Sequence, residues 1–120
     1  MISYIQSYLS SIKYIHGLIK FNENKIDDAH SKWEIIWHNG NANQKKEIKG
    51  FIQLSDSIIQ FNRCKLDSVN YLLTFASKNI DKSEIFKPHF HFKSLINDIN
   101  SIIEKLENNN LIELKINIKF

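Results

Sequence analysis

Apolar residues recur at steps of three and four along almost the whole chain, which is the spacing of a helix with one buried face. The clearest stretch lies between positions 92 and 106, where charged and polar residues occupy the opposite side. Its apolar members are Phe92, Leu95, Ile96, Ile99, Ile102, Ile103 and Leu106. This periodicity predicts an all-α fold and constrains the chain more than any other feature.

The same spacing predicts four earlier helices, at about 3–21, 26–37, 44–63 and 66–80. The third has the widest apolar face, so a central position is expected for it. The stripe of the first helix is expected to hold six residues: Ile2, Ile5, Leu9, Ile12, His16 and Ile19. A polar stretch that contains Pro88 separates the fourth helix from the fifth.

A chain of 120 residues is long enough for one buried core and too short for two ordinary domains. We therefore expect a single five-helix bundle over residues 1–120. From 111 to 120 the period changes to two, as in a half-buried strand, with Ile112, Leu114, Ile116, Ile118 and Phe120 as its apolar members. This tail is expected to be extended or strand-like, lying across the helices or pairing with the same segment of another copy. A homodimer through the tail is the predicted assembly.

The net charge of +3 is mildly basic, but lysines are interspersed with acids rather than gathered in a block. Nucleic acid is therefore an unlikely partner. No apolar run approaches the roughly 20 residues that span a bilayer, and no signal peptide is recognisable. With Cys64 as its only cysteine, the chain fits a reducing compartment. Its many Ile, Asn and Lys residues are typical of an AT-rich genome, so the cytoplasm or a plastid stroma is expected.

The segment from His30 to Trp37 concentrates the groups that can bind a metal or a polar ligand. His30 and Glu34 are four residues apart and Trp37 follows three later, so a helix places all three along one edge. Such a pair can stabilise the helix alone, by roughly 0.2–0.5 kcal/mol. It can also present one nitrogen and one oxygen to a divalent metal such as Zn, Mn or Fe, if Asp27 or His16 supplies a third ligand.

The order of these residues is similar to an uncharacterised helical family of bacteria and archaea, domain of unknown function family 309. Its hallmark is His-x-x-x-Glu-x-x-Trp or Tyr. The matching positions, within about 15–80, are Phe21-Asn22, Ala29-His30, Trp33-Glu34, Trp37 and Gly50-Phe51-Ile52-Gln53. Many members carry Glu directly after the histidine, where this chain has Ser31. The resemblance implies an all-helical bundle with a suspected divalent metal site.

Two classes of function remain open. The first is a non-catalytic dimeric module whose polar site binds a small ligand, a metal or a partner protein, with His30, Glu34, Trp37 and Gln53 as its candidate binding residues. The alternative is a divalent-metal-dependent hydrolase, in which His30, Glu34 and a third ligand would hold a metal-bound water. The lack of a complete catalytic set in the sequence favours the first class.

Overall fold

The computed structural model describes residues 2–84, 91–111 and 113–119, with side chains described from residue 12 onward. Five α-helices and one short 3₁₀ turn make up the described chain. They are α1 (Ile2–Asn22), α2 (Ile26–Asn39), α3 (Ala42–Asn62), η1 (Leu66–Ser68), α4 (Val69–Asp81) and α5 (Phe92–Glu107). The predicted all-α fold with five helices is confirmed, and the described residues contain no strand.

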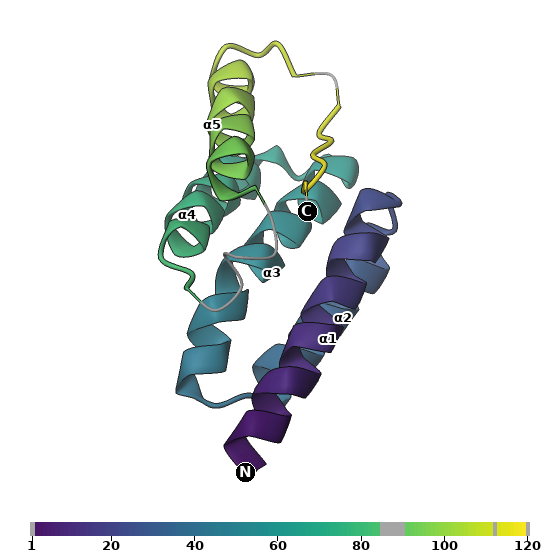
Figure 1. The fold of residues 1–120 in the computed structure, drawn as a ribbon. Coiled ribbons are helices and arrows are strands. Elements are labelled where there is room, and N and C mark those ends of the chain that lie inside the picture. Colours follow the sequence, from purple (N-terminus) through teal and green to yellow (C-terminus); the bar gives the residue numbers. More distant parts are fainter. Residues whose placement is uncertain (1, 85–90, 112, 120) are drawn as a thin grey trace.

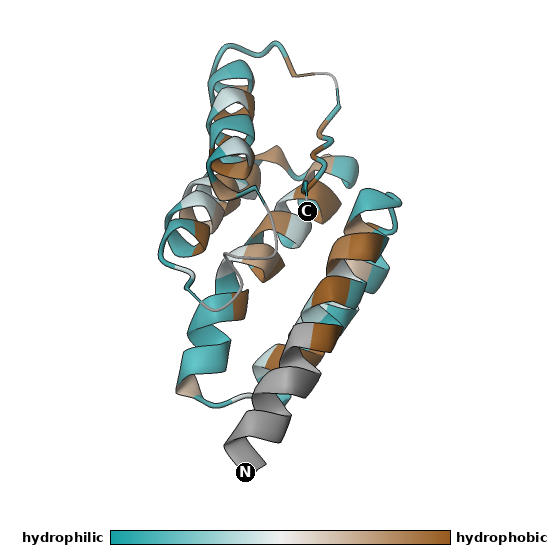
Figure 2. Cartoon of the chain, in the orientation of Figure 1, coloured by the Kyte–Doolittle hydropathy of each residue, from teal (hydrophilic) through white to brown (hydrophobic). Residues whose placement is uncertain are grey.

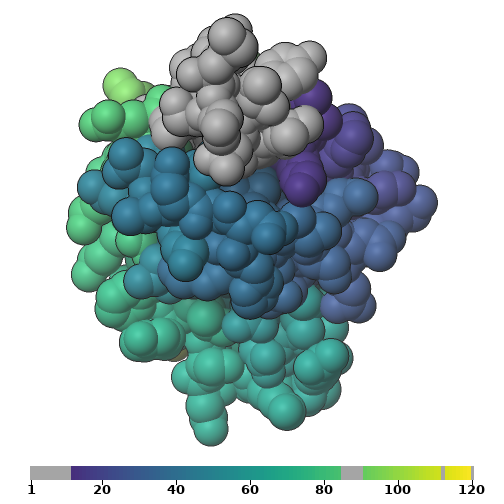
Figure 3. Space-filling model, turned by 90° about the horizontal axis from the view of Figure 1, so that it is seen from below, coloured from purple at the N-terminus to yellow at the C-terminus, as the bar shows by residue number. Residues whose placement is uncertain are grey.

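Helix α3 lies in the middle of the bundle, as its wide apolar face predicted. It packs against α2 on one side and α4 on the other, while α1 covers α2 and α5 covers α4 (Figure 1). The molecule is elongated, with principal extents of 50 × 25 × 24 Å. Seen from below, the segment around the α2–α3 connection (blue) lies between α4 (green) and α1 (purple) in Figure 3. Helix α3 therefore connects the α1–α2 pair to the α4–α5 pair.

The start of α3 is fixed by a capping box that places it two residues earlier than the expected Gln44. The Asn41 side chain accepts from the Gln44 backbone N–H at 2.9 Å, and the Gln44 side chain accepts from the Asn41 N–H at 2.8 Å. The two side chains thereby satisfy amides that a helix N-terminus leaves without intrahelical partners. Gly40 ends α2 directly before this cap.

The core of the α1–α2–α3 half is a cluster of aromatic rings around Trp33, which is fully buried. The Trp33 ring centroid lies 5.8 Å from that of Phe21 and 5.5 Å from that of Phe51. The Trp33 indole N–H donates to the Tyr14 carbonyl at 3.2 Å, so the indole also has a polar partner. Apolar surfaces of the helices meet in the interior, and hydrophilic residues cover much of the outside (Figure 2).

The stripe expected for the first helix is wrong in its described part. His16 is exposed and Ile19 is 44% exposed, whereas Tyr14, Leu18 and Phe21 are buried. The aromatic cluster explains the difference, because Trp33 and Phe51 pack on the Tyr14–Phe21 side of the helix. The side chains of Ile2, Ile5 and Leu9 lie outside the described residues.

In the C-terminal tail the side chains of Leu114, Ile116 and Ile118 are buried. The Asn22 side chain donates to the Ile118 carbonyl at 2.8 Å and accepts from the Ile118 N–H at 2.7 Å. Because these apolar side chains are covered by their own chain, a second copy could pair only with the tail backbone. The homodimer stays a prediction. Ile112 and Phe120, two members of the predicted alternation, lie outside the described residues.

A buried carboxylate fixes the segment after α4. Glu47, on α3, accepts from the Ser83 hydroxyl at 2.5 Å and from the Glu84 N–H at 2.9 and 3.0 Å.

Burial, and to a lesser extent the charge of Glu47, raises the pKa of Tyr14 above its ordinary value. Tyr14 therefore stays protonated across the physiological range.

Candidate functional site

A chain of three side chains connects α2 to α3 through hydrogen bonds. The His30 Nε2 atom lies 2.8 Å from Glu34 Oε1, and His30 Nδ1 lies 2.8 Å from the Ser55 Oγ atom. His30 and Glu34 stand one turn apart on α2, whereas Ser55 is fully buried on α3. The three residues form a brace between the two helices, which we call the Glu34–His30–Ser55 brace.

The protonation of His30 depends on where the single hydroxyl proton of Ser55 goes. The Ser55 Oγ also lies 2.8 Å from the Ile52 carbonyl, which can only accept. If the proton goes to Ile52, His30 Nδ1 must donate, and the ring is an imidazolium because Nε2 donates to the Glu34 carboxylate. If the proton goes to His30, the ring is neutral. In both cases Glu34 receives a hydrogen bond from His30.

The order of carboxylate, imidazole and hydroxyl has the composition of a serine hydrolase triad, but its geometry does not expose a nucleophile. Ser55 has no solvent-exposed surface, and its Oγ is within hydrogen-bonding distance of the carbonyl three residues earlier in its own helix. A nucleophilic hydroxyl must reach a substrate carbonyl and needs oxyanion donors beside it. The brace therefore fits a helix-to-helix contact better than a catalytic triad.

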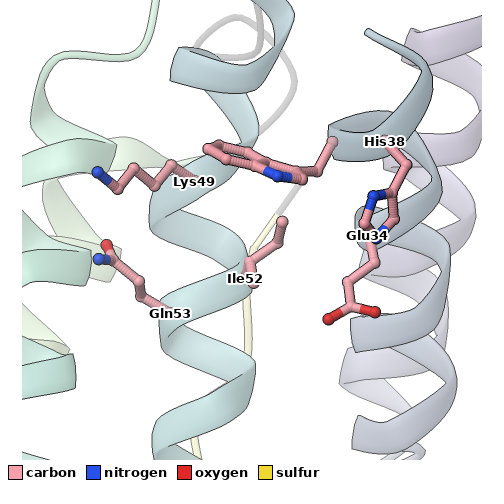
Figure 4. Close-up of a pocket in the computed structure, with 6 residues that line it drawn as sticks. Glu34, His38, Lys49, Ile52 and Gln53 are labelled. Atoms are coloured by element: carbon pink, nitrogen blue, oxygen red, sulfur yellow. The ribbon is translucent and has the colours of Figure 1, made fainter.

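The outer end of the brace opens onto a groove between α2 and α3, with a volume of about 300 Å³. Its lining residues are Glu34, Trp37, His38, Lys49, Ile52 and Gln53. In Figure 4, Glu34 and His38 come from α2 and Ile52 lies between them and the backbone of α3. Lys49 and Gln53 extend from α3 toward the side opposite Glu34. The groove thus has a carboxylate at its α2 side and the apolar side chain of Ile52 in its middle, while the Lys49 ammonium points away from Glu34.

Two of the groove side chains are held by neighbours. The Gln53 Oε1 atom accepts from the Asn79 amide of α4 at 2.7 Å. The Lys45 ammonium lies 5.7 Å from the centroid of the Trp37 ring, within the range of a cation–π contact. These contacts restrict the Gln53 and Trp37 side chains, so part of the lining is ordered without a ligand.

Among the candidate binding residues, Glu34, Trp37 and Gln53 line the groove, and His30 supports Glu34 from behind. The candidate third metal ligands are placed elsewhere. His16 is exposed on α1, and Asp27 lines a separate hollow beside Arg63. Among the described side chains no group of three or more His, Cys, Asp or Glu residues could hold a metal ion.

The sequence interpretation did not assign a role in the site to Ser55, Ile52, Lys49 or His38. Ser55 had a recognisable signal, because it is a polar residue within the apolar stripe of α3 and a buried hydroxyl needs a partner. Lys49 and His38 had none, since their place in the groove depends on how α2 and α3 are turned toward each other.

No helix in the described part of the chain is long and apolar enough to cross a membrane. Comparisons with other proteins add no further constraint. No protein-family model, no curated protein and no solved structure matches this chain. The similarity to the helical family with the His-x-x-x-Glu-x-x-Trp hallmark therefore rests on the motif residues alone and stays a prediction.

Proposed function

We propose that this protein is a non-catalytic helical binding module whose groove between α2 and α3 takes a small ligand. The observation that carries the proposal is the position of Glu34. One of its oxygens is held by His30, which in turn contacts the buried Ser55, while its carboxylate lines the groove. A side chain held in this way loses less conformational entropy when a ligand binds.

The lining indicates the chemistry of the ligand. A carboxylate accepts hydrogen bonds and attracts cations, and the second oxygen of Glu34 adds acceptor capacity beyond the bond to His30. The Trp37 indole and the Ile52 side chain offer apolar surface next to it. The Lys49 ammonium extends away from Glu34, so this lysine does not pair with the carboxylate (Figure 4). We therefore propose an ammonium group joined to an apolar body.

The groove has the size of small-molecule sites, which begin at about 300 Å³. The metal-dependent hydrolase has less support, because His30 uses both ring nitrogens in hydrogen bonds and the described chain brings no third ligand to the pair. Glu34, Trp37 and Gln53 thus remain the proposed binding residues, and His30 is proposed to position Glu34.

Titration with a matched pair of probes tests the proposed ligand class. We expect phenethylamine to shift the backbone NMR signals of Glu34, Trp37 and Ile52, and phenylacetate, which has a similar body but opposite charge, to leave them unchanged. Replacing Glu34 by glutamine removes the charge at constant shape. It should weaken phenethylamine binding at least about tenfold, since a charge-assisted hydrogen bond contributes roughly 1.5–3 kcal/mol.

Glu104→Gln provides the control, because it removes an acid from an exposed position on α5 outside the groove. This variant should bind phenethylamine as the unmodified protein does. Equal binding of both probes, or an equal effect of the two glutamate substitutions, would contradict the proposed recognition by Glu34.

A further inference from the structure

We propose that the groove between α5 and the C-terminal tail is a second binding site, specific for a ligand that carries phosphate groups. The groove has a volume of about 370 Å³ and is separate from the α2–α3 groove. Its polar lining residues are Asp98, Ser101 and Lys105 from α5, and Lys115, Asn117 and Lys119 from the tail.

The alternation of the tail places its polar residues along one edge of this groove. Leu114, Ile116 and Ile118 are buried against the bundle, whereas Lys115, Asn117 and Lys119, which alternate with them, are exposed. Lys115 and Lys119 are four residues apart, so their side chains leave the backbone at separate points along the groove.

The facing edge comes from α5, where residues three and four apart lie on the same face of the helix. Asp98, Ser101 and Lys105 are all exposed and follow this spacing. A row of α5 residues and a row of tail residues therefore line one groove, and each carries at least one lysine.

The end of the tail is held by hydrogen bonds at two adjacent residues, Ile118 and Lys119. The Asn22 side chain makes two bonds to Ile118, and the His91 N–H donates to the Lys119 carbonyl at 2.7 Å. The backbone at Lys119 is thus held by hydrogen bonds, and Lys115 is placed by its buried neighbours Leu114 and Ile116, while both lysine side chains are exposed.

The charges of the lining favour an anion of more than one charge. Three lysines and one aspartate line the groove, so positive charge exceeds negative charge by two. Lysine ammonium groups bind phosphate as point charges, and the Ser101 hydroxyl and Asn117 amide add neutral donors. Ile102 and Ile116 also line the groove at its base, and both are largely buried.

A soluble phosphate ester and a phosphorylated lipid headgroup share this chemistry, and two probes distinguish them. The first probe is inorganic pyrophosphate, titrated while backbone NMR signals of Ser101, Lys105 and Asn117 are followed. The second is a phosphatidylcholine vesicle containing phosphatidic acid, measured by cosedimentation. The test variant carries Lys115→Gln and Lys119→Gln, both at exposed positions, so the fold should be retained.

We expect pyrophosphate binding to fall about tenfold in this double variant, because each exposed ion pair contributes up to roughly a factor of five. Asp98→Asn should instead strengthen binding by about two- to fivefold. A control with Lys46→Gln and Lys65→Gln lowers the net charge equally at exposed positions outside the groove and should bind nearly unchanged.

Vesicle binding with the same lysine dependence would support a headgroup as the source of the phosphate, and pyrophosphate binding without vesicle binding would support a soluble phosphate compound. Failure of both probes to bind, or an equal loss in the two double variants, would overturn the site. Tighter binding of a mixed-sequence oligonucleotide than of pyrophosphate through the same lysines would overturn the assigned ligand class.

Discussion

Replacing Trp33 by alanine is expected to lower the free energy of unfolding by about 3–5 kcal/mol, the range for removing a large buried aromatic side chain. Trp33 is fully buried, packs against Phe21 and Phe51, and donates its indole N–H to the Tyr14 carbonyl. Alanine would leave a cavity in the α1–α2–α3 half and remove the donor. Since small domains have only about 5–15 kcal/mol of stability, the variant should unfold at a much lower urea concentration.

Trp37→Ala is the matched control, because it removes the same side chain from the same helix. Trp37 is only half-buried, at the edge of the core, so we expect a loss of about 1–2 kcal/mol. Urea unfolding followed by circular dichroism measures both variants. Equal losses would contradict the central position of Trp33 in the core.

Replacing Gly17 by alanine is expected to lower the free energy of unfolding by about 1–3 kcal/mol, the range for inserting an atom into a packed core. A Cβ atom at Gly17 would lie 2.1 Å from Trp33 Nε1 and 2.6 Å from Trp33 Cε2, so the buried indole would have to move. In an ordinary helix interior, replacing glycine by alanine instead raises the free energy of unfolding by roughly 0.5–1 kcal/mol. The sign of the effect therefore reports on the close approach of α1 to Trp33.

A double-mutant cycle separates this contact from other effects of the new methyl group. In a Trp33→Ala background the obstructing ring is gone, so Gly17→Ala should become neutral or stabilising. Urea unfolding of the four proteins measures the coupling. A loss that is the same with and without Trp33 would show that Gly17 is required for another reason.

The helices were predictable from the sequence because their signals are local. The apolar stripe of 92–106 matches α5 within one residue, since spacing along one helix determines which side can be buried. The start of α3 was misplaced by two residues because the reciprocal bonds of Asn41 and Gln44 set it, rather than the apolar pattern.

The first helix shows where the local signal fails. It is apolar around much of its circumference, so two stripes compete, and the one with Tyr14, Leu18 and Phe21 is buried. The stripe that is buried is the one that meets Trp33 and Phe51 of the neighbouring helices and that contains the close approach at Gly17. His16 was thus expected inside the bundle and lies on its surface.

Part of the candidate site was predictable because three of its residues lie on the same helix. His30, Glu34 and Trp37 lie on one helix at fixed spacing, so their shared edge followed from the sequence. Ser55 and Lys49 come from α3, and their approach to that edge depends on the rotation of one helix against the other. Spacing within one helix does not specify that rotation.

The central claim is that His30 and Ser55 join α2 to α3 and hold Glu34 at the groove without a metal. The most direct test is a double-mutant cycle of His30→Ala and Ser55→Ala, measured by urea unfolding with a chelator and again with added Zn²⁺ or Mn²⁺. The account predicts a coupling of about 1 kcal/mol, typical of one hydrogen bond, that is the same under both conditions. A His30→Ala protein that loses stability only when metal is present would contradict it and make the motif a metal site.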